Sequence, residues 1–351
     1  MSKSETPPSP APRSWCRAFA SLIAGLLLLA TVAGFGGRLW WVPGLLSSFR
    51  FQLLQLSVLT TIALLLGRWW HRWRIGLPAA FAMVAALLNG FLIAPLWLSP
   101  PEQAASGPAI TIVAVNLNYG NARLDERGSA APIAKVLDES EADVIIVEEI
   151  TAHRLGVLSR ALPNYRHVTG TGRPDPFGIA LFVRKTAEAP AATAALLIES
   201  AREIDTTQGL VNVKSVELLC QWRGKPLSVL GMHTISAVHA RSDQYRAAML
   251  DGAAQWARTQ QQAGRAVILC GDLNATPWCA PFIDLCEKGE LLDSHRGFAM
   301  QNTWPSNFPG FLRIPIDHCL HSKSLITRSR KILHQDLGSD HLPLLVTLQW
   351  R

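Results

Sequence analysis

The first hundred residues of the chain contain three long apolar stretches separated by short polar segments. The stretches cover roughly residues 18–35, 45–67 and 76–98. Each approaches the length of about 20 apolar residues that a helix needs to cross a hydrocarbon core. Tryptophans, whose rings prefer the membrane–water interface, cluster at the ends of the stretches: Trp15, Trp40, Trp41, Trp69, Trp70, Trp73 and Trp97. The pattern predicts a membrane anchor of three transmembrane helices over residues 1–98, with the lipid bilayer as its partner.

Basic residues indicate how such an anchor would be oriented. Residues 1–100 hold eight basic residues and one acid, so the whole formal net charge of +7 belongs to this part of the chain. Six of the basic residues precede the first stretch or separate the second from the third: Lys3, Arg13, Arg17, Arg68, Arg72 and Arg74. The positive-inside rule places these segments in the cytoplasm. We therefore expect a multi-pass protein of the inner or plasma membrane, with the rest of the chain on the periplasmic or extracellular side.

Residues 99–108, SPPEQAASGP, are rich in proline, serine and glycine and predict a linker. An alternative interpretation of the N-terminal part is a cleaved signal peptide followed by two buried helices. The first stretch lacks a clear small-x-small cleavage site followed by a mature domain, so the sequence favours three membrane spans.

Beyond the linker, short apolar runs alternate with helical patterns. The runs AITIVAVN (109–116), DVIIVEE (143–149) and AVILCGD (266–272) are continuous, as is typical of strands buried on both faces. Residues 130–140 place apolar side chains on one helical face, and residues 240–262 predict a long helix. The alternation predicts a layered α/β domain over residues 109–351.

Polar side chains of the kinds that carry chemistry lie at the ends of these apolar runs. They are Asn116, Glu148, Glu149, His233, Asp272, Asn274, Asp317, His318, Asp340 and His341. The strand ends of an α/β sheet converge on one rim, so we expect many of these side chains to meet there. Carboxylates with amides and imidazoles, but no cysteine, suit a hard cation such as Mg²⁺ or Mn²⁺. Such a cation would neutralise the charge of a phosphate ester.

Seven motifs carry these residues and their strands: AVNLNYGN, ADVIIVEE, GIALFVR, GMHT, GDLNATPW, RIPIDH and GSDHLP. In this order, from about residue 110 to 350, they resemble the endonuclease/exonuclease/phosphatase superfamily, which includes pancreatic-type deoxyribonucleases and neutral sphingomyelinases. The resemblance implies that superfamily's fold, a four-layer α/β sandwich of two packed mixed β-sheets flanked by helices. Here the three transmembrane helices would precede it.

The resemblance also implies which residues bind the metal, expected to be Mg²⁺ or Mn²⁺. Glu149 matches the metal-binding glutamate, Asn116 supports the metal and the phosphate, and Asp340 is the second acid on the metal side. Superfamily members commonly have glutamine before the metal-binding glutamate, whereas this chain has Glu148 there. The departure leaves open whether Glu148 or Glu149 is the ligand, although the alignment of the motifs favours Glu149.

By the same resemblance, four residues form the catalytic set. Asp272 would orient or deprotonate the attacking water. His341 would bind the phosphate or handle a proton, with Asp317 holding its ring. His233 would hydrogen-bond the phosphate, and Asn274 would bind it beside Asp272.

Three neighbouring residues have less specific interpretations. Asn118 is expected to be a loop residue, and His318 to be structural, because adjacent strand residues point to opposite faces. Arg313 is as compatible with a surface role as with a contact to phosphate. The six cysteines show no CxxC spacing, so a zinc site is not indicated, and pairing of Cys279 with Cys286 is left open.

The resulting hypothesis is a membrane-anchored, divalent-metal-dependent phosphoesterase in which water attacks a phosphodiester or phosphomonoester. The chain has no GxSxG elbow, Walker loop or dinucleotide fingerprint, so water is the expected nucleophile. The alternative is a non-catalytic membrane-bound binding or scaffold module on the same fold. The substrate stays open among nucleic acids, nucleotides and lipid head groups. The 25 basic and 25 acidic residues of 101–351 weaken the nucleic-acid interpretation, and no protein partner is predicted.

Overall fold

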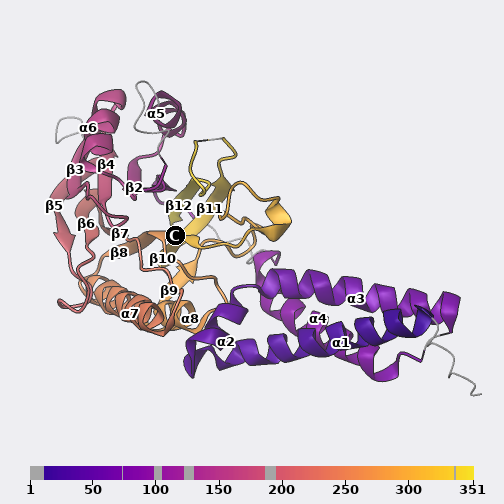
Figure 1. Ribbon diagram of the computed structural model, residues 1–351. Helices are drawn as coiled ribbons and strands as arrows, with labels where there is room; N and C mark the ends of the chain where they lie inside the picture. The colour runs from indigo at the N-terminus through magenta and orange to yellow at the C-terminus, as the bar shows by residue number, and fades with distance from the viewer. Residues whose placement is uncertain (1–11, 73, 99–104, 122–129, 186–194, 336) are drawn as a thin grey trace, which may run out of the picture. The chain divides into compact units, whose positions relative to one another are not determined.

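A computed structural model describes residues 12–72, 74–98, 105–121, 130–185, 195–335 and 337–351 (Figure 1). Lys3, Trp73 and residues 99–104 of the predicted linker lie outside the described residues. The chain divides into two compact units, Met1–Ala94 and Pro95–Arg351.

The N-terminal unit is built of helices. They are α1 (Pro12–Ala33), η1 (Gly34–Arg38), α2 (Trp41–Ser47), α3 (Arg50–His71) and α4 (Gly76–Ile93), with the turn η2 (Ala94–Leu96) at its end. Three segments are long and apolar enough to cross a membrane: Trp15–Arg38, Arg50–Trp70 and Gly76–Leu96. The second begins at Arg50 rather than near residue 45, because α2 ends at Ser47 and a turn separates it from α3. Three such helices suggest that the protein associates with a membrane.

A buried polar cluster joins the three long helices. Arg50, at the start of α3, donates from Nη1 to the Thr31 carbonyl at 2.6 Å and to Asn89 Oδ1 at 3.3 Å. Asn89 of α4 donates in turn to Thr31 Oγ1 at 2.8 Å. Thr31 lies in the last turn of α1, where carbonyls lack helical partners and the helix dipole favours a cation. The cluster therefore satisfies the end of α1 while linking it to α3 and α4.

The C-terminal unit contains two six-stranded sheets. In the first, the strand order is β11 (Leu325–Ile332), β12 (Leu344–Trp350), β1 (Ala109–Asn116), β2 (Val144–Glu148), β4 (Ile179–Arg184) and β3 (Tyr165–Thr171). In the second it is β5 (Leu196–Ile204), β6 (Ser215–Trp222), β7 (Lys225–Gly231), β8 (Ala266–Asp272), β10 (Asp317–Ser322) and β9 (Leu291–Asp293). Both sheets are mixed, because β1–β2 and β7–β8 are parallel and the other pairs are antiparallel.

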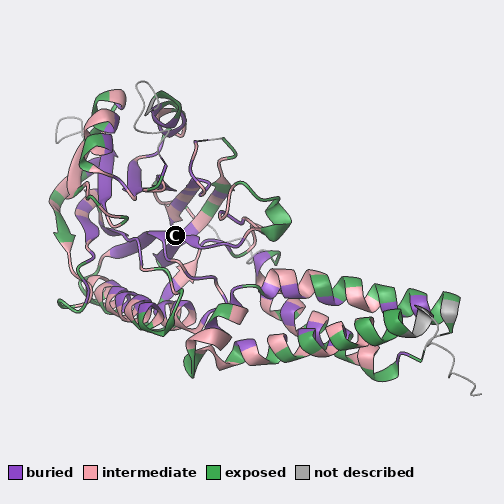
Figure 2. Ribbon diagram, viewed as in Figure 1, coloured by how far each residue is buried: buried purple, intermediate pink, exposed green. Residues whose placement is uncertain are grey.

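Helices cover the outer faces of the two sheets. Side chains of α5 (Ala130–Glu139) and α6 (Ala152–Ala161) pack on the first sheet. Those of α7 (Ala240–Gln262) and α8 (Ala280–Gly289) pack on the second, and the buried residues form continuous layers between them (Figure 2). This arrangement is the predicted four-layer α/β sandwich.

The continuous apolar runs follow from burial on both sides of each sheet. In β1, Ile110 and Ile112 point into the core between the two sheets. Val113 and Val115, at the alternate positions, pack against α5 and α6 instead. Because successive strand residues face opposite sides, a strand covered on both faces is apolar at successive positions, as from Ile112 to Val115. The next polar residue of β1 is Asn116, at the rim of the sandwich.

Cysteines and buried histidines complete the core. All six cysteines are free, so Cys279 and Cys286 form no disulfide. His295, His318 and His321 are buried in or beside β10, and burial lowers the pKa of each, that of His295 to about 3. These rings are therefore neutral in the folded protein.

The neutral histidines predict that the protein loses stability in mild acid. Because the folded pKa of His295 lies below its ordinary value, the unfolded chain takes up the proton more readily. The free energy of unfolding therefore decreases as the pH falls from about 6.5 toward 3. By pH 5, protonation of His295 in the unfolded chain accounts for about 2 kcal/mol of this decrease. Chemical denaturation of the full chain in detergent at pH 7.5 and 5 should show a smaller pH difference for His295→Gln. The exposed His153→Gln variant should behave like wild type, and equal pH differences in all three proteins would refute the assignment.

Candidate active site

The ends of four strands meet at one rim of the sandwich. Asn116 ends β1 and is the register partner of Glu148, the last residue of β2. Asp272 ends β8 and is the register partner of Asp317, the first residue of β10. Asn116 Nδ2 donates to Asp272 Oδ2 at 3.1 Å, across the junction between the two sheets. The rim expected from the sequence therefore draws residues from both sheets.

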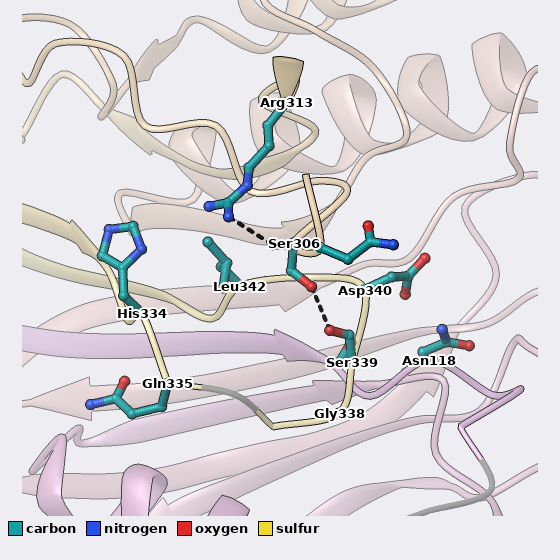
Figure 3. A pocket seen from close by; sticks show the side chains of 10 residues that line it. Asn118, Ser306, Arg313, His334, Gln335, Gly338, Ser339, Asp340 and Leu342 are labelled. Atoms are coloured by element: carbon teal, nitrogen blue, oxygen red, sulfur yellow. Dashed lines mark hydrogen bonds between the residues drawn. The ribbon is translucent and has the colours of Figure 1, made fainter. Parts of the chain in front are cut away.

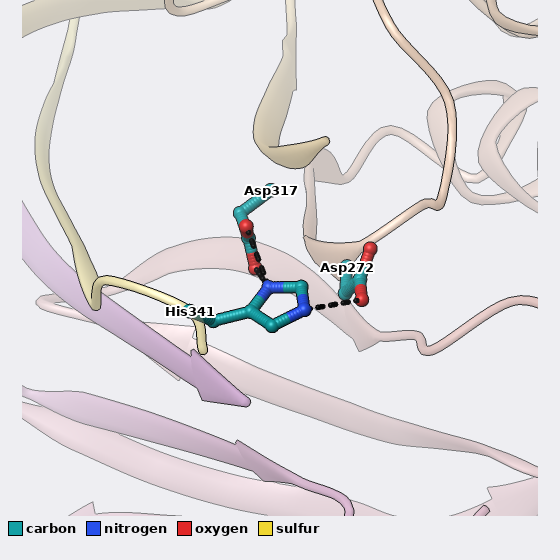
Figure 4. A group of neighbouring side chains, drawn as sticks. All are labelled: Asp272, Asp317 and His341. Carbon is teal, nitrogen blue, oxygen red and sulfur yellow. Dashed lines mark hydrogen bonds and ion pairs between the residues drawn. The ribbon is translucent and has the colours of Figure 1, made fainter. Parts of the chain in front are cut away.

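Asp272, Asp317 and His341 form a buried acid–imidazole–acid group (Figure 4). His341 Nδ1 lies 3.0 Å from Asp317 Oδ2, and Nε2 lies 3.6 Å from Asp272 Oδ2. Burial alone would lower the pKa of His341, but the charges of Asp317 and Asp272 outweigh it and raise the pKa to about 10. Burial would likewise raise the pKa of Asp317, yet His341 holds it below its usual range. The imidazole is therefore an imidazolium clamped by two carboxylates.

Glu149 points into the same site. Its backbone adopts a left-handed conformation with φ 55°, which is uncommon for a residue other than glycine. Its Oε1 accepts a hydrogen bond from Asn116 Nδ2 at 2.9 Å, and its Oε2 accepts one from the Tyr119 N–H at 2.6 Å. His233 Nε2 lies 3.7 Å from both Glu149 Oε1 and Asp272 Oδ2. Glu149, Asn116, His233 and Asp272 are thus brought together as expected.

Glu148 lies beneath the site rather than in it. Its Oε2 accepts the Asp272 N–H at 3.0 Å, and within the described residues its Oε1 has no hydrogen-bond partner. Burial raises the pKa of Glu148 well above its usual value, and the charges of Asp272 and Asp317 add to the effect. A carboxyl that supports the Asp272 backbone is poorly placed to bind an ion at the rim. The geometry favours Glu149 over Glu148 as the metal-binding glutamate.

Glycine is required just before Asp272. Gly271 has φ +145°, and a Cβ there would lie 2.1 Å from the Met232 carbonyl oxygen and 2.4 Å from Glu148 Oε1. A side chain at this position would therefore push β8 away from Met232 and Glu148. Gly271 thus lies close to the Met232 backbone and to the Glu148 side chain, immediately before Asp272, which contacts Asn116.

Asn274 fixes the turn that follows Asp272. Its backbone N–H donates to Asp272 Oδ1 at 2.8 Å, and its Nδ2 donates to the Thr234 carbonyl at 2.9 Å. Ser236 Oγ lies 2.5 Å from Asn274 Oδ1, and the buried Arg246 donates to the Asn274 carbonyl. The Asn274 side chain thus lies at the rim, and its hydrogen bonds are made with the loop that carries Thr234 and Ser236.

Asp340, the residue before His341, lies in the wall of a cavity (Figure 3). Its carboxylate accepts a hydrogen bond from Trp304 Nε1 at 2.9 Å. The cavity has a volume of about 520 Å³. Its lining includes Asn118, which the sequence assigns only to a loop. The sequence did not predict the contact of Trp304 with Asp340 or the cavity, because no local motif identifies side chains that come together from separate loops.

The segment before His341 docks against β1. Ser339 Oγ donates to the Asn116 carbonyl at 2.7 Å and accepts the His341 N–H at 3.1 Å. His318 instead packs beneath the site, where its Nε2 lies 2.8 Å from the Ala275 carbonyl. The structural role expected for His318 agrees with this burial.

The charges of the rim fit a divalent cation. Among the described residues, the carboxylates Glu148, Glu149, Asp272 and Asp317 have no lysine or arginine ion-pair partner; the ion pairs found involve histidines. The nearest ligand atoms of Asp272, Asp317 and His341 lie within 4.8 Å of one another. However, His341 and Asp317 use those atoms on each other. Glu149, whose side chain is 17% exposed and bonded to Asn116, is therefore a better donor for a hard cation, together with Asn116.

A family model for the endonuclease/exonuclease/phosphatase family matches residues 113–341. The chain belongs to this family. Family members are phosphoesterase hydrolases, and the matched region begins in β1 and ends at His341. Among curated proteins, none matches the chain significantly.

Solved structures share the endonuclease/exonuclease/phosphatase fold at low sequence identity. A family protein from Bacteroides thetaiotaomicron is 21% identical, with a TM-score of 0.55, and the match covers 70% of this chain and 99% of that one. A mannosyl-6-phosphatase from the same species is 20% identical, with a TM-score of 0.55 over 69% and 100% of the two chains. The human Nocturnin catalytic domain with bound sulfate is 18% identical, with a TM-score of 0.54 over 71% and 97%. These likenesses establish the fold of the C-terminal unit.

Proposed function

We propose that the protein is a membrane-anchored, divalent-metal-dependent phosphoesterase in which water attacks a phosphodiester or phosphomonoester. The observation that carries the proposal is the junction of the two sheets. There Asn116 Nδ2 bridges Glu149 and Asp272, and His341 Nε2 lies 3.6 Å from the same Asp272 oxygen, Oδ2. A buried group with this excess of negative charge is suited to a cation and to the phosphate that the cation would attract.

Asp272 is the proposed base for the attacking water. Burial raises its pKa to about 6, against the opposing charge of His341, so at neutral pH it is ionised yet close to its pKa. The Asn274 N–H and Asn116 Nδ2 each donate to this carboxylate and fix its orientation. A base that is oriented and poised near the working pH transfers a proton most effectively.

His341 and His233 are the proposed donors to the phosphate oxygens. Asp317 holds the His341 ring in its protonated form, so Nε2 carries a hydrogen toward the site. His233 is oriented by its Nδ1, which lies 3.2 Å from the Pro176 carbonyl. Donors fixed in advance stabilise the charge that develops on the phosphoryl oxygens.

Glu149 and Asn116 are the proposed holders of Mg²⁺ or Mn²⁺, with Asp340 contributing from the cavity wall. When bound, the ion would neutralise phosphate charge and favour attack by water. The chain's own contribution is to keep the Glu149 carboxylate aimed at the site, through Asn116 Nδ2 and the Tyr119 N–H. The catalytic unit's position on the periplasmic or extracellular side stays a prediction from the flanking charges.

Metal-stimulated hydrolysis by the full chain in detergent tests the proposal. Cleavage of bis-p-nitrophenyl phosphate and p-nitrophenyl phosphate would be measured with Mg²⁺, with Mn²⁺ and with EDTA. We expect hydrolysis of at least one probe to rise about 100-fold or more with metal, and EDTA to abolish it reversibly. Metal binding without turnover of these probes or of a phospholipid would favour the scaffold alternative and overturn the enzyme.

A further inference from the structure

The loop between Trp304 and β10 displays large apolar side chains. Phe308 is 47% exposed, Phe311 57% and Leu312 44%. No charged residue occurs from Pro305 to Leu312. Exposed apolar patches of this kind on a folded domain mark surfaces that meet a protein, a ligand or a membrane.

Hydrogen bonds hold this loop to the segment that carries Asp340. The Ser306 N–H donates to the Asp340 carbonyl at 2.7 Å, and Ser306 Oγ donates to the Ser339 carbonyl at 2.7 Å. Arg313 donates from Nε to the Phe308 carbonyl and from Nη2 to the Ser306 carbonyl, both at 2.6 Å. These bonds fix the loop backbone, so the apolar side chains are presented at a defined place beside the site.

The same loop forms one side of the polar cavity beside Asp340. Ser306, Asn307 and Arg313 line it from the loop, and Asn118 and Ser339 line it from the opposite segments (Figure 3). The hollow is therefore lined largely by hydroxyl, amide and charged groups, while Phe308, Phe311 and Leu312 are exposed on the same loop. A polar hollow on an apolar loop matches a ligand with a polar head and an apolar tail.

We propose that the substrate is a phosphate ester carried by a membrane lipid, with its head group in this cavity and residues 308–312 dipping into the bilayer. The inference rests on the proposed phosphoesterase function. Water would add to phosphorus and one P–O ester bond would break, releasing an alcohol and a phosphate, with no other reactant. The loop would supply the apolar contact that draws the site to the lipid surface.

Chain connectivity favours the bilayer as the occupant. The last of the three candidate membrane spans ends at Leu96, and the first strand of the C-terminal unit begins at Ala109. The twelve residues 97–108 between them can extend to at most about 43 Å. A domain tethered so closely meets the lipid surface far more often than any dissolved partner.

Charge disfavours a nucleic acid at the same surface. Strands of nucleic acid are held by grooves rich in lysine and arginine beside stacking aromatic rings. Residues 305–312 carry no cation, and residues 101–351 hold equal numbers of basic and acidic residues. Leu312 offers no ring on which a base could stack, whereas it suits an acyl chain.

The first test compares lipid and soluble substrates of the full chain in nanodiscs. Dioleoyl phosphatidic acid and dioleoyl phosphatidylglycerol would be the bilayer probes, and the two p-nitrophenyl phosphates the soluble probes. Phe308→Ser/Leu312→Ser should lower lipid hydrolysis about tenfold or more, while soluble-probe hydrolysis stays within about twofold. Leu197→Ser is the matched control, because Leu197 is 54% exposed and pairs with Gln221, near the end of β6 away from Ser215 and the rim. It should change neither rate.

The second test measures the loop's depth without relying on activity. A spin label at Leu312→Cys, in a Cys16→Ser background, should show membrane-like oxygen accessibility in nanodiscs. A label at Leu197→Cys should remain accessible to a water-soluble nickel complex.

The outcomes distinguish a failure of the proposed phosphoesterase function from a failure of the lipid proposal. Failure of wild type to hydrolyse any soluble or lipid probe would overturn the proposed function. Three results would overturn the lipid proposal alone. The wild type could hydrolyse soluble probes but leave the lipids intact, or the loop variant could lose activity equally on both probe classes. The third result is a water-exposed label at residue 312. Preferential cleavage of single-stranded DNA, lost in the loop variant, would also overturn it in favour of a nucleic acid.

Discussion

Replacing Asp272 with asparagine is expected to reduce the metal-stimulated hydrolysis rate about 1,000-fold. The substitution keeps the side chain's size and its ability to accept the Asn274 N–H, but it removes the group that would take a proton from water. The rate on the p-nitrophenyl probe that wild type cleaves, at saturating metal, is the measurement. Asp251→Asn is the control, because Asp251 pairs with Lys288 on the surface, and its rate should match wild type.

Stability distinguishes a catalytic loss from a folding defect in the same variant. Burial raises the pKa of Asp272, and the charge of Asp317 adds to the increase, so the ionised form is disfavoured in the metal-free protein. Removing that charge should leave the metal-free melting temperature unchanged or higher. A rate within tenfold of wild type, or a rate loss accompanied by a lower melting temperature, would contradict the role assigned to Asp272.

The adjacent residues Glu149 and Glu148 should differ in how substitution by glutamine changes the Mg²⁺ requirement. Glu149→Gln is expected to raise the Mg²⁺ concentration for half-maximal activity by about 100-fold, because the rim loses its proposed carboxylate ligand. Glu148→Gln should leave this concentration within about threefold of wild type, a value below the 10- to 100-fold cost of disturbing a metal site. Its amide oxygen can still accept the Asp272 N–H, and the raised pKa of Glu148 already disfavours a charge there.

The pair of variants forms its own control, because the two substitutions are chemically identical at neighbouring positions. Magnesium titrations of activity provide the measurement, with direct binding of Mn²⁺ followed by electron paramagnetic resonance as an independent readout. A large shift for Glu148→Gln with none for Glu149→Gln would transfer the ligand role to Glu148.

Local sequence patterns predicted the strands and the composition of the rim. Continuous apolar runs such as that ending at Asn116 are produced by burial on both sheet faces, so the strand and its polar end are both visible in the sequence. The same logic located Asp272 and Glu149. The family resemblance supplied the expected fold and separated Glu149 from Glu148 by position. In the structure Glu148 lies beneath the Asp272 backbone, whereas Glu149 contacts Asn116.

Contacts between distant loops could not be predicted in this way. The bond between Trp304 and Asp340, and the cavity that Asn118 shares with Arg313, depend on how three loops fold over the rim. No periodicity records such a meeting, because loop conformation is decided by tertiary packing. The partners of Arg50, at the start of α3, could not be predicted for a related reason. The Arg50 side chain is satisfied by Thr31 and Asn89 on other helices, and spacing along one segment does not reveal such partners.

The first sheet is assembled from opposite ends of the catalytic unit. Strand β1 pairs with β12, whose last residue is Trp350, and Asp340 and His341 immediately precede that strand. A nascent chain that has emerged only as far as β10 therefore has an unpaired edge on β1 and lacks His341. The sheet therefore cannot close until β12 has been synthesised. The proposed site would thus stay inactive until the segment that carries His341 has been synthesised and β12 has paired with β1.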